Sequence, residues 1–76
     1  MTQTVGEFLQ SRIHKSFTVA GDDLYALGYL STSERIALSG LIGDSLEAFA
    51  EALKGDGLAE AASREIADEH LAILLK

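Results

Sequence analysis

Two short motifs, each followed by a run of apolar residues, mark the starts of helices in this chain. Thr4 and Glu7 form the pattern T-x-x-E, and Ser31 and Glu34 form S-x-x-E. In this pattern, the capping box, the hydroxyl and the carboxylate each accept a hydrogen bond from a backbone N–H that the first helical turn leaves unpaired. The sequence therefore predicts helices that begin at about residues 4 and 31.

After each capping box, apolar residues recur at steps of three and four, which is the spacing of one helical face. The first helix is expected to cover residues 4 to 27 and the second residues 31 to 54. A third helix is expected over residues 57 to 75, capped by Asp56 or Gly57. Alternation of period two is missing, and so is proline. We therefore predict an all-α fold, a small three-helix bundle with short connections.

The apolar residues of the first helix predict the face that it turns to the core. Gly21 interrupts this helix at a cost of about 1 kcal/mol relative to alanine, so the helix is expected to bend or restart there, with Asp22 or Asp23 as a new cap. Gly28 suits the left-handed position that follows a helix end. The predicted core face comprises Val5, Phe8, Leu9, Ile13, Phe17, Ala20, Leu24 and Leu27.

Gly40 and Gly43 lie in the middle of the predicted second helix, where each glycine costs about 1 kcal/mol of helix stability. We interpret them as small residues of a continuous helix that let a neighbouring backbone, in the domain or on a partner, approach closely. A second interpretation breaks the helix at Gly43, with Asp44 as a new cap and Glu47 three residues later. If the helix is continuous, close contact has to offset the cost of both glycines.

The chain has 76 residues and no cysteine, so a disulfide-stapled module and a zinc-thiolate site are excluded. A chain of this length buries only about 60% of the surface that its unfolded form exposes, so a partner would add usefully to its stability. No run approaches the roughly 18 apolar residues of a membrane span, and the N-terminus lacks the apolar run of a signal peptide. We expect a single helical domain, residues 1 to 76, with the cytoplasm as the default compartment because cysteine is absent.

The net charge of −6, from 12 acidic and 6 basic residues, argues against binding to nucleic acid or to a membrane surface. A helix-turn-helix interpretation of residues 24 to 38 fails as well, because the part that would enter DNA, residues 31 to 38, carries Arg35 as its sole basic residue. The acidic helical faces suggest an alternative function, an inhibitor that mimics nucleic acid and occupies the basic groove of a DNA-binding or nuclease complex. Such faces are more often simply solvated, and Glu60 with Arg64 is expected to form an ordinary i, i+4 ion pair.

No constellation of residues indicates catalysis, a metal or a cofactor. His14 and His70 both lack a second metal ligand three or four residues away on a helix. A hydrolytic triad would need one of them to meet a serine and an acid in a deep pocket, which a three-helix domain of this size seldom holds. We therefore expect no enzymatic activity, no cofactor and no small-molecule substrate.

Residues 14 to 53 resemble a segment that recurs in small helical proteins encoded beside the prohead proteases and capsid proteins of tailed phages. There the pattern reads approximately ADDLYA.G.L, followed by ER.ALS..IGDAL.AF. Ser45 stands where the pattern has alanine, and Gly40 stands where alanine or serine is usual. The resemblance implies a phage or prophage origin, a location in the cytoplasm of a bacterial host or in a virion, and a role in head assembly, and it implies no catalytic residue. The matching residues are Asp22, Asp23, Leu24, Tyr25, Gly28, Leu30, Glu34, Arg35, Ala37, Leu38, Ser39, Ile42, Gly43, Asp44, Leu46, Ala48 and Phe49.

We predict from these features a non-enzymatic helical module that acts by protein–protein contact, with itself or with a partner protein, in phage head or capsid assembly. Self-association into a homo-oligomer is the expected state. The two glycines of the second helix and the apolar C-terminal run LAILLK supply the expected contact surface. The predicted interface consists of Gly40, Leu41, Gly43, Leu71, Leu74 and Leu75.

Overall fold

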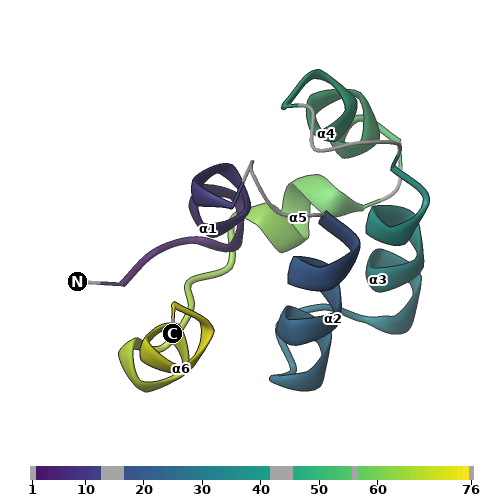
Figure 1. The fold of residues 1–76 in the computed structure, drawn as a ribbon. Helices are drawn as coiled ribbons and strands as arrows, with labels where there is room; N and C mark the ends of the chain where they lie inside the picture. Colours follow the sequence, from purple (N-terminus) through teal and green to yellow (C-terminus); the bar gives the residue numbers. More distant parts are fainter. Residues whose placement is uncertain (1, 13–16, 42–45, 56, 76) are drawn as a thin grey trace.

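The described residues fold into six short helices (Figure 1). The computed structural model describes residues 2–12, 17–41, 46–55 and 57–75. Within these ranges the only β-type pairing is an isolated antiparallel bridge between Thr4 and Glu65. The fold is therefore all-α, as predicted. The helices are α1 (Val5–Ser11), α2 (Phe17–Ala26), α3 (Thr32–Ser39), α4 (Leu46–Leu53), α5 (Leu58–Ala62) and α6 (Asp68–Leu74).

The prediction of three long helices is wrong, because the structure divides each of them in two. The first is divided between α1 and α2, and α2 runs through Gly21 without a break, so no new helix begins there. The second is divided between α3, which ends at Ser39, and α4, which begins at Leu46. The third is divided between α5 and α6 by a non-helical segment, residues 64–67.

Both capping boxes predicted from the sequence are present. The Glu7 N–H donates to the Thr4 hydroxyl at 3.1 Å, and the Thr4 N–H donates to Glu7 Oε1 at 3.4 Å. At α3 the Glu34 N–H donates to the Ser31 hydroxyl at 3.2 Å, and the Ser31 N–H donates to Glu34 Oε1 at 2.7 Å. These bonds pair N–H groups that have no partner inside a helix, so residues close together in the sequence determine where α1 and α3 begin.

The turn between α2 and α3 is built around Gly28, whose φ is +88°. The Gly28 N–H donates to the Tyr25 carbonyl at 3.0 Å, and the Tyr29 N–H donates to the Leu24 carbonyl at 2.9 Å. This pair of bonds is a Schellman motif, which needs a left-handed residue just past the helix and therefore favours glycine. The predicted left-handed glycine is confirmed.

The end of α4 and the start of α5 agree with the sequence to within a residue. α4 ends at Leu53, one residue before the predicted end of the second helix. Gly57, one of the two predicted caps, precedes α5 with a φ of +74°, and no side chain caps the helix there. The other predicted cap, Asp56, lies outside the described residues.

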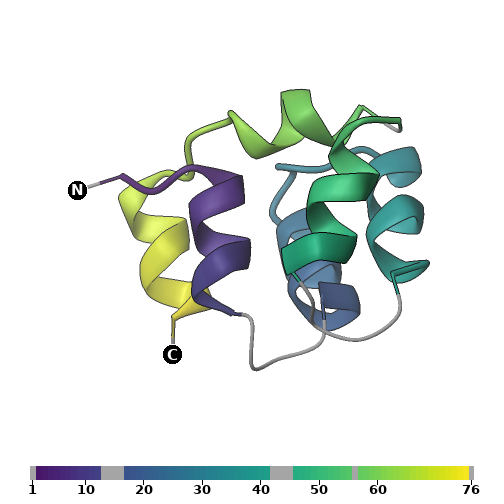
Figure 2. The ribbon, with the colours of Figure 1, turned by 90° about the horizontal axis from the view of Figure 1, so that it is seen from above.

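Close packing of glycine does occur in this fold, but at glycines other than the predicted ones. α2 and α3 lie side by side as an antiparallel hairpin (Figures 1 and 2), and a Cβ built on Gly21 would lie 3.3 Å from the Cβ and the Cδ1 of Leu38. Between α1 and α5, a Cβ on Gly6 would lie 3.2 Å from the Cβ of Ala62. At both places the missing side chain lets two helices approach, which offsets the low helix propensity of glycine.

Gly40 ends α3 instead of continuing a long helix. It caps the helix with φ of −81° and ψ of −7° and is exposed. A Cβ there would meet only the carbonyl oxygens of Ala37 and Ile36, at 3.5 and 3.7 Å. The prediction of a continuous helix through Gly40 is therefore wrong, and no other described segment packs closely on this glycine. Gly43 and Asp44, on which the alternative break depended, lie outside the described residues.

Apolar side chains from all six helices meet in one core. The short helix α5 lies between α1, α3 and α4 (Figure 1), and the rings of Phe17 and Phe49 pack with their centroids 5.6 Å apart. The radius of gyration, 11.0 Å, matches the value of about 11 Å for a compact domain of this length. The predicted core face of the first helix is confirmed, except that Leu27 is only half-buried and Ile13 lies outside the described residues. The buried apolar residues are Val5, Phe8, Leu9, Phe17, Ala20, Leu24, Leu30, Leu38, Phe49, Leu58, Ala61, Ile66 and Leu74.

A backbone pairing between the two ends of the chain explains why the third predicted helix is divided. The Val5 N–H donates to the Arg64 carbonyl and the Ile66 N–H donates to the Gln3 carbonyl, both at 2.8 Å. These backbone groups are therefore unavailable for a helix that would run on from α5. The pairing also buries Ile66 completely and sets the direction in which α6 leaves the core.

The contrast between Gly21 and Gly40 predicts opposite responses to the same substitution. Gly21→Leu should lower the free energy of unfolding by about 1–3 kcal/mol, because the new side chain overpacks the contact with Leu38. Gly40→Leu should change it by no more than about 0.5 kcal/mol, because the position is exposed. Urea unfolding of both variants, followed by circular dichroism, measures the two values. A larger loss at Gly40 than at Gly21 would contradict this account of the packing.

Candidate functional site

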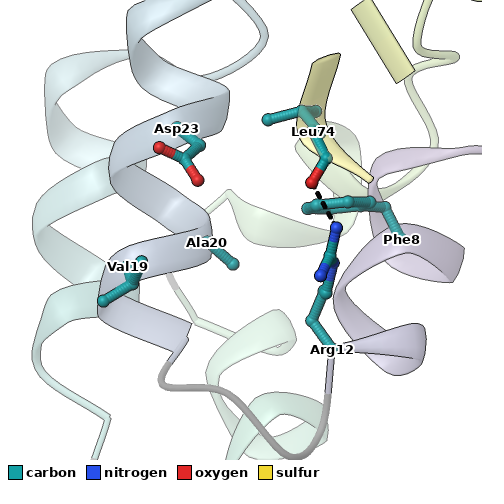
Figure 3. Close-up of a pocket in the computed structure, with 6 residues that line it drawn as sticks. All are labelled: Phe8, Arg12, Val19, Ala20, Asp23 and Leu74. Carbon is teal, nitrogen blue, oxygen red and sulfur yellow. Dashed lines mark hydrogen bonds between the residues drawn. The ribbon is translucent and has the colours of Figure 1, made fainter. Parts of the chain in front are cut away.

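An open groove runs between α2 on one side and α1 and α6 on the other (Figure 3). We call it the α2–α6 groove. Its smaller part is lined by Phe8, Arg12, Val19, Ala20, Asp23 and Leu74. Its larger part is lined by Asp23, Ala26, Leu27, Ile73 and Leu74. Because Asp23 and Leu74 line both parts, the two form one continuous depression.

The dimensions of the groove suit side chains better than a free small molecule. The smaller part has a volume of ≈ 30 Å³ and the larger part of ≈ 220 Å³. Small-molecule sites usually begin at about 300 Å³ and enclose most of the ligand, whereas this groove is open to solvent. Val19 and Ile73 border it with exposed fractions of 55% and 57%. The groove therefore offers apolar surface along its length rather than an enclosed pocket.

Arg12 closes one end of the groove. Its guanidinium Nη2 donates to the carbonyl of Leu74 in the last turn of α6, and the group lies 5.2 Å from the centroid of the Phe8 ring. A cation is favourable at the C-terminus of a helix, where carbonyl oxygens lack partners. Arg12 lies outside the predicted core face of the first helix, and in the structure it holds α6 against α1.

Asp23 differs from its neighbour Asp22 in having no partner. Asp22 accepts a hydrogen bond from Arg35 at 3.2 Å, and the same guanidinium lies 4.8 Å from the centroid of the Tyr25 ring. The carboxylate of Asp23 takes part in no hydrogen bond or ion pair of the described residues, and it lies on the α2 side of the groove (Figure 3). The groove thus carries one exposed, unpaired negative charge among apolar side chains.

Tyr29 anchors the start of α6 through polar contacts. Its hydroxyl accepts a hydrogen bond from the Ala67 N–H at 2.7 Å and lies 2.7 Å from Nδ1 of His70. The Thr2 hydroxyl also donates to Asp68, in the first turn of α6, at 3.3 Å. Among the described residues, α6 packs less extensively on the other helices than those helices pack on one another. Its position, and therefore the width of the groove, depends strongly on these hydrogen bonds.

Glu34 is a buried charged residue with a partner that the sequence did not indicate. Its side chain, 8% exposed, pairs with Arg64 through bonds of 2.9 and 3.3 Å, and Arg64 also donates to the Tyr29 carbonyl. Burial by itself would raise the pKa of Glu34. The Ser31 N–H and hydroxyl and the hydrogen bonds and charge of Arg64 outweigh burial and lower this pKa below its usual 4.5. The predicted pair of Glu60 with Arg64 is wrong, because α5 ends at Ala62 and Arg64 turns to Glu34 instead.

The structure does not bring the predicted interface residues together. Gly40 and Leu41 lie at the end of α3, on the side of the molecule opposite α6 (Figures 1 and 2). Of the three leucines at the C-terminus, Leu74 is buried and lines the groove, Leu71 is half-buried against the core, and Leu75 is exposed. Gly43 lies outside the described residues. A contact made by all of these residues at once would have to involve two separate surfaces.

The sequence did not predict most of the residues that line the groove. Val19 lies outside the predicted core face, and an apolar residue there was the one available sign of a second apolar face on α2. Ile73 is exposed because α6 begins in a new direction at residue 68, which the sequence did not predict. Nothing in the sequence distinguishes Asp23 from Asp22.

The described part of the chain holds no group of three or more metal-ligating side chains, and none of its helices combines the length and apolar character needed to cross a membrane. Of the two histidines, His70 contacts Tyr29, and His14 lies outside the described residues. No protein-family model matches the chain, and neither does any of the curated proteins or solved structures compared with it.

The Glu34–Arg64 pair predicts a pH dependence of stability. A folded-state pKa lower than the unfolded one contributes stability that is fully present above about pH 4.5 and is lost as the pH falls through the lower value. Glu34→Gln keeps the capping box, since glutamine serves at this position, and should cost about 1–2 kcal/mol at pH 7 because it removes the charge. The difference between the two proteins should shrink below pH 4.5.

Glu60→Gln is the matched control, because Glu60 is exposed and its carboxylate pairs with nothing in the described structure. Urea unfolding from pH 7 to pH 3 should show no such convergence for this variant. A Glu34→Gln difference that stays constant down to pH 3 would contradict the lowered pKa.

Proposed function

We propose that this chain is a non-enzymatic helical module that binds another protein through the α2–α6 groove. The observation that carries the proposal is the pair of apolar walls that α2 and α6 turn toward each other and leave open to solvent. Val19 and Ile73 are more than half exposed there, beside the buried Ala20 and Leu74. Removing such side chains from water is worth about 25 cal/mol per Å² of apolar surface, so a partner gains by covering them.

The chemistry of the groove supports binding rather than catalysis. Its titratable residues are Arg12 and Asp23, and its other lining residues are apolar. Arg12 already donates to the Leu74 carbonyl. The lining residues include no serine, threonine, cysteine, histidine or lysine that could act as a nucleophile or a neutral base.

The biological setting of the proposal comes from the resemblance of residues 14 to 53 to segments encoded beside phage prohead proteases and capsid proteins. We propose on this basis a phage or prophage origin and a role in head assembly. Assembly proteins act through protein contacts, which agrees with an open apolar groove on a small, acidic helical domain. The net charge of −6 favours a neutral or basic partner over a second copy of the chain.

Ile73 and Ile36 allow a matched test of the groove. Both isoleucines are exposed, at 57% and 58%, but only Ile73 lines the groove. A displayed library of amphipathic helical peptides of about 15 residues, roughly 22 Å long, should yield sequences that bind the wild-type protein. Ile73→Lys should weaken their binding by at least about tenfold, or about 1.4 kcal/mol, because it places a charge on the apolar wall. Ile36→Lys should leave their binding unchanged.

Light scattering of the wild type and both variants at two salt concentrations tests whether a second copy of the chain occupies the groove. A dimer that Ile73→Lys dissociates would make a second copy the occupant of the groove. Binding of selected peptides that is indifferent to Ile73→Lys would overturn the groove as the interface. Steep loss of that binding with salt would then favour the acidic inhibitor that mimics nucleic acid, since exposed charge pairs are screened over about 8–10 Å at physiological ionic strength.

A further inference from the structure

Asp23 is the one charged residue that lines the larger part of the α2–α6 groove, where its neighbours are Ala26, Leu27, Ile73 and Leu74. It also lines the smaller part, beside Val19. Among the described residues its carboxylate has neither a hydrogen bond nor an ion pair. Any segment that covers both Val19 and Ile73 must therefore also cover this carboxylate.

Covering an unpaired carboxylate with apolar groups is unfavourable, because the charge loses its hydration and gains nothing in return. The nearest cation of the groove, Arg12, lines only the smaller part and is already bonded to the carbonyl of Leu74. Arg35, the cation that contacts the neighbouring Asp22, is held by that carboxylate and by the ring of Tyr25. Neither of these two described cations is free to pair with Asp23, so we expect the compensating charge to come from the partner.

We infer that the partner segment is an amphipathic helix that carries one Lys or Arg among its apolar residues, and that this cation pairs with Asp23. This inference rests on the proposed function and specifies its partner. A helix fits because the walls of the groove are helices, which present side chains and no free strand edge for an added strand. α2 has 10 residues and is about 15 Å long, so about 10 residues of the partner helix can lie along it.

The negative charge of the domain also favours a basic partner helix. With a net charge of −6, the protein attracts basic segments from a distance and repels acidic ones, which raises the rate of correct encounters. In the bound state the apolar side chains supply affinity, and the pairing with Asp23 discriminates between basic and acidic helices of similar hydrophobicity.

The test uses the same displayed library, with apolar residues at fixed helical positions and the intervening positions randomised. Selection on the wild-type protein should enrich Lys or Arg at one randomised position. Asp23→Asn should lower the affinity of the selected peptides by at least about tenfold. Selection repeated on this variant should no longer enrich Lys or Arg. Asp22→Asn is the matched control, because it removes the same charge one residue away and should change binding by less than about twofold. Exchanging the enriched basic residue for Gln should weaken binding to the wild type but not to Asp23→Asn.

Two results would overturn the inference, and they are distinguishable from each other. Peptides that lose affinity on Ile73→Lys but show no basic enrichment, or respond equally to Asp22→Asn and Asp23→Asn, would overturn the pairing while the proposed function stands. Peptides that bind the wild type no better than Ile73→Lys would overturn both the pairing and the groove as a binding site.

Discussion

Arg64 joins three parts of the chain that are far apart in the sequence. Its carbonyl accepts a hydrogen bond from Val5 at the start of α1, and its guanidinium donates to Glu34 at the start of α3 and to the carbonyl of Tyr29 in the turn before it. Glu34 is thereby kept charged although it is buried. Partly buried charged hydrogen bonds of this kind specify position more than they add stability, and here they set where the N-terminus and residues 64–67 cross.

The groove is a consequence of this crossing. Because residues 64–66 pair with the N-terminal segment, the chain leaves α5 in an extended conformation, and α6 starts in a new direction beside α1 (Figure 2). α6 contributes Leu74 and the half-buried Leu71 to the core and is also held by the polar contacts of Tyr29, Thr2 and Arg12. A chain of this length has too few residues to cover both faces of every helix. The outer face of α2 and the exposed face of α6 therefore remain uncovered and opposite each other.

This arrangement gives the proposed binding surface two separate properties. The apolar walls around Val19 and Ile73 supply surface that any apolar helix could cover, and Asp23 adds a requirement that only some helices meet. Because the walls are short, the affinity for a single helix is expected to be modest, so the charge pairing contributes much of the selectivity.

The sequence by itself determined the features that depend on residues a few positions apart. Both capping boxes, the left-handed Gly28, the helical fold class and most of the core face of residues 4 to 27 are as predicted, because each arises from one helical turn or one repeating face. Only the tertiary structure decided which glycines pack closely, how the predicted helices are divided and which acid partners Arg64. Gly21 lies inside α2, where Leu38 of α3 packs against it, whereas Gly40 caps α3 and meets only carbonyl oxygens of its own helix. The sequence alone could not predict the groove either, because the exposure of Val19, Asp23 and Ile73 depends on the direction of α6. A backbone pairing between residues some 60 positions apart determines that direction.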